Sequence, residues 1–194
     1  IKTMAKYDNI CNYIHLPVQS GSNNILKAMN RQHTREEYFE LIDNIKTLLP
    51  DCTISHDIIC SFPTESEEDH KDTLSLMEYV KYSFGYMFAY SERPGTLAER
   101  KMKDDIPEEV KKRRLSEVVE LQQKHSLYRS QEFLNQVTEV LIEKTSKKNN
   151  DIFTGKIDGG HITHLDKGNL VIGDYVNVEI KEATPFYLKA EIIN

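Results

Sequence analysis

The sequence is poor in the residues on which several classes of protein depend. It has no tryptophan, and its three cysteines, Cys11, Cys52 and Cys60, form no CxxC pair and no spacing typical of a zinc site. An odd number of cysteines without a disulfide framework is typical of a reducing compartment, so we expect a cytoplasmic protein with buried free thiols. No apolar run approaches the roughly 20 residues of a membrane-spanning helix, which argues against a membrane partner.

Positive charge and nucleophile motifs are also missing. The formal net charge of −6 provides no general attraction to nucleic acid, so RNA binding would need a local basic patch. No phosphate-binding glycine loop and no nucleophile–His–Asp signature is present, so hydrolase and NTPase functions have no support. The chain starts at Ile1 with neither an initiator methionine nor a signal peptide, and we expect it to be part of a longer protein.

The first ninety residues alternate between strand and helix patterns. The periodicity of apolar residues and the capping signals at Ser22, Thr34 and Ser66 predict strands over 13–18, 53–60 and 84–90, and helices over 22–29, from 34 to 49, and from 66 onward. Crossover connections of this length make the strands parallel and the connections right-handed. The pattern therefore predicts one flank of a parallel α/β barrel or of a doubly wound sheet.

The second part of the chain changes from helical to strand periodicity. A long helix is predicted over about 106–131, with a basic run at 111–114 that either forms a solvated face or contacts RNA phosphates. Five short strands with period two then follow, which we expect to be antiparallel and to close a small OB-like barrel; they cover 137–142, 153–157, 161–165, 175–180 and 186–190. We place the domain boundary near 132, between a domain of residues 1–132 and a barrel of residues 133–194.

Three polar residues stand out in the first domain. Gln19 follows the first strand, Asp57 lies on the polar face of the second, and Arg31 follows the first short helix. An amide and a carboxylate on neighbouring strands suit the two hydroxyls of a ribose, and a guanidinium matches a carboxylate or phosphate. Each residue also has a structural interpretation: a buried Asp satisfying a loop amide, or an Arg capping a helix end.

The barrel carries several lysines but little net charge. Lys147, Lys148 and Lys156 could form a local basic edge, yet residues 136–194 hold seven Lys, no Arg and nine Asp plus Glu, a net charge of −2. Such a barrel would at best be a weak, positional RNA binder. His161 and His164 are three residues apart in a predicted strand, so we interpret them as surface residues rather than as metal ligands.

A series of short motifs, taken in order, resembles the radical S-adenosylmethionine methylthiotransferases, and most of all the MiaB branch that modifies tRNA. The motifs are His15 to Ser22, Met29-Asn30-Arg31, Asp57-Ile58-Ile59, Phe62-Pro63, Tyr90 to Thr96, Ile106 to Lys111 and Arg114-Leu115. The last barrel resembles a TRAM domain. The Arg93-Pro94-Gly95-Thr96 segment favours this branch over the sister enzymes that modify a ribosomal protein.

The resemblance implies a fold, a reaction and a set of ligand residues. It implies the C-terminal part of a partial TIM-like radical S-adenosylmethionine barrel, in a parent enzyme that transfers a methylthio group to N6-isopentenyladenosine beside the tRNA anticodon. Full-length members bind S-adenosylmethionine and two [4Fe-4S] clusters. The residues matching Gln19 and Asp57 hold the cofactor's ribose, and the one matching Arg31 pairs with its methionine carboxylate. We add Ser20 and Phe62 to the predicted cofactor site, and Arg93, Lys147, Lys148 and Lys156 to the predicted RNA site.

The sequence also departs from the family's pattern. The CxxxCxxC cluster motif and the N-terminal domain of full-length members are absent, so no metal ligand is predicted and the chain alone is expected to be inactive. Ser61 and Thr64 stand where the family usually has glycines around Phe62-Pro63, which places the backbone geometry of that loop in question. The alternatives are a non-catalytic tRNA-binding or regulatory module and a sister tRNA or ribosomal-protein methylthiotransferase.

Overall fold

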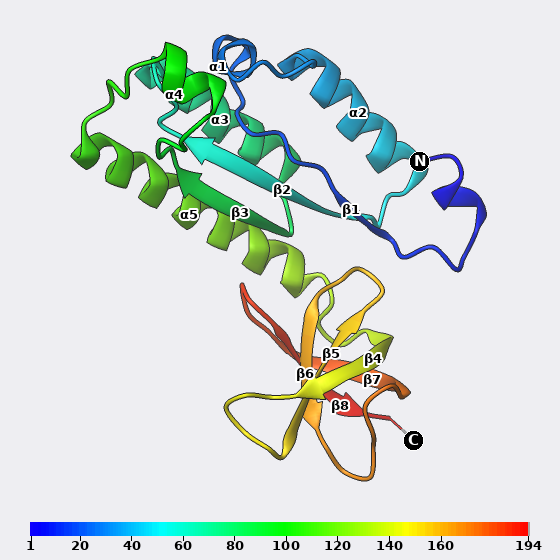
Figure 1. The fold of residues 1–194 in the computed structure, drawn as a ribbon. Helices are drawn as coiled ribbons and strands as arrows, with labels where there is room; N and C mark the ends of the chain where they lie inside the picture. Colours follow the sequence, from blue (N-terminus) through cyan, green and yellow to red (C-terminus); the bar gives the residue numbers. More distant parts are fainter. Residues whose placement is uncertain (194) are drawn as a thin grey trace.

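The computed structural model describes residues 1–193 and shows a helix-covered parallel sheet followed by a separate small barrel (Figure 1). The elements of the first part are η1 (Met4–Lys6), β1 (Tyr13–His15), α1 (Asn23–Ala28), α2 (Arg35–Leu48), β2 (Thr53–Cys60), α3 (Glu67–Val80), β3 (Phe84–Ala89), α4 (Leu97–Lys101) and α5 (Glu108–Gln131). Those of the barrel are β4 (Val137–Thr145), β5 (Ile152–Ile157), β6 (Ile162–Asp166), β7 (Tyr175–Ala183) and β8 (Leu188–Ile192).

The three strands of the first part form a parallel sheet in the order β1-β2-β3, as the crossover lengths predict. β1 is shorter than the predicted 13–18, because its regular pairing ends at His15, opposite Ser55. The chain nevertheless continues along β2, with an isolated parallel bridge between Gln19 and Ile58. The tip of β1 therefore stays attached to β2 beyond the regular strand.

Side-chain caps fix where the helices begin. Ser22 caps α1, and Thr34 and Ser66 form capping boxes with Glu37 and Asp69, so the predicted starts of these three helices are confirmed. The apolar residues of α2 are only partly buried, because Leu41 and Leu48 are exposed. The buried core residues are Val18, Tyr38, Ile42, Ile45, Ile54, Ile58, Cys60, Leu76, Met77, Val80, Tyr82 and Val118.

The two faces of the sheet have different surroundings. Ile54 and Ile58 share one face of β2 and pack in a core with residues of α2, α3 and α5. The other face carries Tyr86 and Phe88 of β3, whose side chains are 62% and 53% exposed. Two large aromatic side chains on an uncovered sheet face are unusual for an ordinary surface. This open face carries the candidate site.

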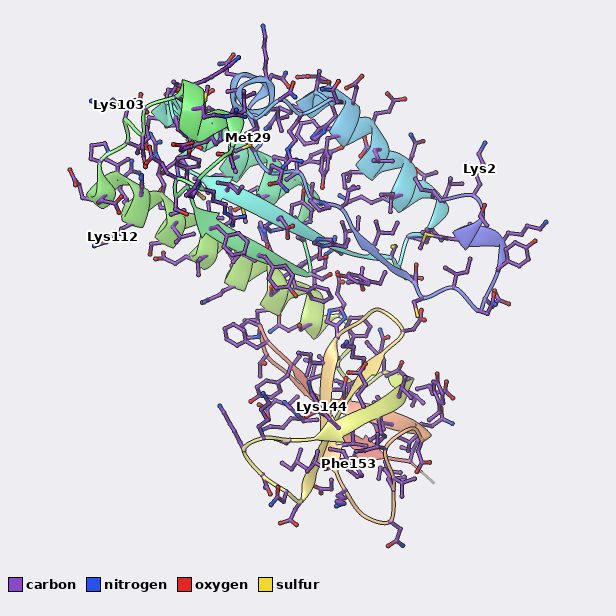
Figure 2. The ribbon with its side chains drawn as sticks, viewed as in Figure 1. Lys2, Met29, Lys103, Lys112, Lys144 and Phe153 are labelled. Carbon is purple, nitrogen blue, oxygen red and sulfur yellow. The ribbon has the colours of Figure 1, made fainter. Side chains whose placement is uncertain are left out.

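The basic run at the start of α5 is not the solvated face that its sequence suggested. Lys111 and Arg114 are buried, Lys111 pairs with Asp104, and Arg114 pairs with Glu65. Lys112 is exposed, and Figure 2 shows it at the outer side of α5. The prediction of a solvated basic face is therefore wrong for two of the four residues, because Asp104, seven residues before Lys111, and Glu65, 49 residues before Arg114, neutralise them.

The second part is a closed five-stranded barrel with the order β4-β5-β6-β8-β7. The expectation of purely antiparallel strands is wrong at one pair, since β6 and β8 run parallel. Its core is a separate cluster of alternating residues: Val140, Ile142, Phe153, Ile157, Leu165, Val178, Ile180, Leu188 and Ala190. α5 ends at Gln131 and β4 begins at Val137, while the division into 1–132 and 133–194 stays a prediction.

The β5–β6 turn joins the barrel to the sheet. Asp158 accepts a hydrogen bond from the backbone N–H of Asn12, and Gly159 lies against Thr53. His161, predicted to be a surface residue, is buried between the rings of Phe84 and Phe133. Burial without a charged partner lowers the pKa of His161 to about 4, so the ring is neutral at pH 7.

No helix within residues 1–193 is long and apolar enough to cross a membrane.

The three cysteines are free thiols, but only Cys60 is buried. Cys52 is half-buried and Cys11 is exposed, which corrects the expectation of three buried thiols.

Candidate functional site

Gln19 is held at the tip of β1 in a strained conformation. Its φ of +71° lies in the left-handed region, which is sparsely populated by residues other than glycine and asparagine. Its backbone N–H donates to the Asp57 carbonyl at 2.9 Å, and its carbonyl accepts from Ile59 N–H at 2.9 Å. The buried Gln19 side chain forms no hydrogen bond within residues 1–193. The fold thus fixes its backbone and leaves its amide available.

Asp57 lies beside this tip on the open face of β2. Its side chain is 31% exposed, and the His15 ring lies beside it, with Nε2 of the histidine 3.5 Å from Oδ2. His15 Nδ1 is in turn 2.8 Å from Ser55 Oγ, which is 2.7 Å from the hydroxyl of Tyr13. A carboxylate that keeps solvent access and one distant partner retains acceptor sites for a ligand's hydroxyl groups.

The Ser55, His15 and Asp57 side chains therefore meet although they are not adjacent in sequence. They do not form a nucleophilic triad, because Ser55 is fully buried and its Oγ is shared between His15 and Tyr13. The arrangement instead fixes the orientation of the His15 ring next to Asp57. The geometry therefore gives no support to a hydrolase, in line with the lack of such a motif in the sequence.

Arg31 follows α1 and leaves its side chain free. The end of α1 is capped by the backbone alone, since Asn30 adopts a φ of +57° and Arg31 N–H donates to Leu26 O at 2.8 Å. The exposed Arg31 guanidinium has no hydrogen bond or ion pair within the part of the chain that the structure describes. The alternative in which this side chain caps the helix has no support, and its pairing with a ligand stays a prediction.

Ser20 and Gly21 fasten the tip to α3. Ser20 is buried with its Oγ 3.3 Å from Thr73 Oγ1, and Gly21 N–H donates to the same hydroxyl at 2.9 Å. The Gly21 carbonyl accepts from Arg35 Nη1 at 2.7 Å. Ser20 thus has a packing role, and its predicted contact with a cofactor stays a prediction. The close approach of Gly21 to α3 was not anticipated from the sequence.

Phe62 lies in the loop after β2 and contributes to an apolar groove. Its ring is buried and meets that of Tyr90 edge-on, with the centroids 5.1 Å apart. The groove has a volume of about 190 Å³, and its walls include Ile59, Phe62, Phe88, Tyr90, Arg93 and Thr96. It lies at the carboxyl ends of β2 and β3, where parallel sheets commonly bind ligands (Figure 1). Arg93, predicted to contact RNA, lies here.

The loop around Phe62 keeps the backbone shape expected of glycines. Ser61 and Thr64 have φ values of +59° and +74°, the left-handed region that glycine adopts at little cost. Ser61 N–H donates to Glu65 Oε1 at 3.0 Å, and Thr64 N–H donates to Asp105 Oδ1 at 2.9 Å. These bonds hold the loop against the strain of two side chains, so the missing glycines leave its left-handed conformation in place.

A buried ion pair supports this loop from α5. Arg114 Nη1 lies 2.9 Å from Glu65 Oε1 and also donates to the Glu65 carbonyl at 3.0 Å. Burial raises the pKa of the Glu65 carboxyl to about 6, although Ser61 N–H and Arg114 favour its charged form. The sequence signal for this pair was the basic run, whose partner 49 residues away could not be assigned from the sequence.

The predicted RNA-binding lysines of the barrel do not form one edge. Lys147 and Lys148 are exposed in the β4–β5 loop and take part in no ion pair with another described residue. Lys156 lies near the other end of β5, where it pairs with Glu143 at 3.3 Å. The structure thus separates Lys156 from the two loop lysines.

Comparisons with known proteins match two separate segments of the chain. A model of the Radical SAM superfamily matches residues 1–77, and a model of the TRAM domain matches residues 131–193. The chain is 63%, 60% and 44% identical to proteins from Christiangramia forsetii, Flavobacterium johnsoniae and Bacteroides fragilis, each named tRNA-2-methylthio-N(6)-dimethylallyladenosine synthase.

These matches cover 98–100% of this chain but only 40–42% of each relative, so the chain spans about two fifths of their length. The chain is therefore similar over its length to these proteins, with a segment that matches the Radical SAM superfamily followed by one that matches the TRAM domain.

Proposed function

We propose that this chain supplies one wall of an S-adenosylmethionine site and the RNA-binding barrel of a tRNA methylthiotransferase. The observation that carries the proposal is the tip of β1. There Gln19 is held at positive φ with its amide unpaired, and its backbone N–H is bonded to the carbonyl of Asp57, whose carboxylate is partly exposed. Residues held in such conformations by the surrounding structure cluster at ligand-binding and active sites.

Each residue of the wall has a defined task in this proposal. The Gln19 amide and the Asp57 carboxylate bind the two ribose hydroxyls, and His15 limits the orientation of Asp57. Arg31 binds the methionine carboxylate through its free guanidinium, and the groove beside Phe62 receives the adenine. When bound, S-adenosylmethionine would be the source of the radical that attacks the adenosine substrate. Ser20 holds the strand tip against α3.

The iron–sulfur clusters do not fit the residues of this chain. Cys11, Cys52 and Cys60 differ in exposure, and within residues 1–193 no group of three or more His, Cys, Asp or Glu could hold a metal. We propose that the region of the relatives that this chain does not cover provides both clusters, and that the chain alone binds RNA without turnover.

The barrel is the proposed contact to tRNA, with Lys147 and Lys148 of the β4–β5 loop as phosphate ligands. Arg93 lies in the groove beside Phe62, where it would meet the substrate at the entrance to the cofactor site. The cytoplasm is the proposed location, because the substrate and the free thiols both fit a reducing compartment.

A chimaera tests this function. The chain replaces the matching 193 residues of the Christiangramia forsetii relative in cells that lack their own enzyme, and the nucleosides of their tRNA are analysed by mass spectrometry. We expect 2-methylthio-N6-dimethylallyladenosine with the chimaera, a strongly reduced amount with its Asp57→Ala variant, and none with the chain alone. A chimaera that accumulates like the intact relative but gives no product contradicts the proposal and favours a non-catalytic RNA-binding module.

A further inference from the structure

The β7–β8 turn presents one aromatic ring to solvent. Thr184 Oγ1 accepts hydrogen bonds from the backbone N–H groups of Phe186 and Tyr187 at 3.2 and 3.0 Å, and Thr184 N–H donates to the Tyr187 carbonyl at 3.0 Å. Pro185 further restricts the backbone between them. The Phe186 side chain is nevertheless 68% exposed. A turn that is fixed by several hydrogen bonds of one threonine and exposes a phenyl ring is preorganised for a contact.

More rings and polar groups lie next to this turn. The Tyr187 ring meets the His164 ring edge-on at 4.9 Å, and His164 Nδ1 lies 3.1 Å from Thr154 Oγ1. His164 is in register with Lys189 of β8, so these side chains share the outer surface. The residues that alternate with them are buried in the barrel: Phe153, Thr163, Leu165, Leu188 and Ala190. We name His164, Phe186, Tyr187 and Lys189 the β6–β8 face; Thr154 lies buried beneath His164.

The charges of this face are already compensated. Lys189 pairs with Glu182, and the neighbouring Lys156 pairs with Glu143. Burial lowers the pKa of His164, so its ring is neutral at pH 7. The face therefore offers flat rings and hydrogen-bonding groups rather than free positive charge. Unpaired nucleobases fit that chemistry, because each has a flat surface that stacks on aromatic rings and polar edges for hydrogen bonds.

We propose that the β6–β8 face stacks on unpaired bases of the RNA substrate, with Phe186 as the principal contact. This inference rests on the proposed function, because it takes RNA as the partner of the barrel. It divides the barrel into two parts: Lys147 and Lys148 contact phosphates, and the β6–β8 face contacts bases. A protein partner is disfavoured because polar and charged groups, among them His164 and the Lys189–Glu182 pair, flank the rings.

Binding of a fluorescently labelled tRNA to the whole 194-residue chain tests the inference at several salt concentrations. We expect Phe186→Ala to weaken binding about tenfold, as loss of one stacked base predicts, with an unchanged dependence on salt. Phe186→Trp keeps the affinity of the original chain. Val171→Ala, which removes another exposed side chain of the barrel, has no effect and serves as the control.

The same titration separates the inference from the proposed function. Replacing both Lys147 and Lys148 with alanine lowers the salt dependence, which is the expected signature of lost phosphate contacts. If that variant loses affinity while Phe186→Ala does not, base stacking on this face is refuted and the RNA-binding role of the barrel stands. If Phe186→Ala weakens binding to a fully paired RNA duplex as much as it weakens binding to tRNA, stacking on unpaired bases is also refuted. A chain that does not bind tRNA at all overturns both.

Discussion

Replacing Arg114 with leucine is expected to lower the free energy of unfolding by about 3–5 kcal/mol at pH 8. The guanidinium is buried and binds both the side chain and the carbonyl of Glu65, so its loss leaves a buried carboxylate without its partner. Glu65 also anchors Ser61 N–H in the loop that carries Phe62. The substitution should therefore disturb the groove as well as the stability.

The expected loss depends on pH. Burial raises the pKa of Glu65 to about 6 in the folded chain, above its ordinary value of 4.5. The folded state therefore binds more protons than the unfolded state between these values, and stability falls as the pH rises through this window. Without Arg114, the pKa of Glu65 rises further. The Arg114→Leu variant should then lose more stability between pH 5 and pH 8 than the original chain loses.

Urea unfolding at pH 5 and pH 8 measures both effects, and the neighbouring Arg113 provides the control. Its side chain is 44% exposed and pairs with Glu67 and Glu117 at the surface, so Arg113→Leu should cost at most about 1 kcal/mol. Adding Glu65→Leu to Arg114→Leu should recover part of the loss, because no buried charge is then left alone. Equal costs for the Arg113 and Arg114 variants would show that the buried pair does not support the loop.

Replacing Gly21 with alanine is expected to cost about 3 kcal/mol. A Cβ atom at this position would lie 2.5 Å from Thr73 Cα and 2.6 Å from the Asp72 carbonyl oxygen. Both are backbone atoms of α3, so the strand tip and the helix must separate, and the hydrogen bond from Gly21 N–H to Thr73 is weakened. Gln19 is two residues away, and its position should shift with the tip.

Gly95 provides the matched control for Gly21. It has a φ of +83° and nothing within 4 Å of an added Cβ, so Gly95→Ala should cost only about 1 kcal/mol for backbone strain. Gly21 has no such φ, and its cost is steric. Thermal unfolding of both variants separates the two causes. A Gly21→Ala variant as stable as Gly95→Ala would show that α3 tolerates displacement, and that the packing of the strand tip is not tight.

Local sequence patterns predicted the helices and strands and the approximate place of the candidate site. The capping residues Ser22, Thr34 and Ser66 mark helix starts because their hydroxyl groups satisfy backbone N–H groups within three residues. Gln19 and Asp57 could be placed side by side because the ends of neighbouring parallel strands meet at one edge of a sheet. These conclusions need only short-range information.

Contacts between distant segments could not be predicted in the same way. Arg114 and Lys111 belong to a basic run that looks solvated until Glu65 and Asp104 are known to face it. The interpretation of His161 as a surface residue rests on its spacing to His164, which says nothing about the sheet packed against the β5–β6 turn. The left-handed conformation of Gln19 likewise depends on two bonds to β2, which no local pattern encodes.

Titration of S-adenosylmethionine into the cluster-loaded chimaera with the Christiangramia forsetii relative tests the proposed cofactor site most directly. Asp57→Ala and Arg31→Ala should each raise the dissociation constant about 10- to 100-fold, since each removes a hydrogen bond that involves a charged group. Lys112→Ala, at an exposed position on α5, should leave it unchanged. Unchanged affinity in both the Asp57 and Arg31 variants would contradict the assignment of this strand tip as a cofactor site.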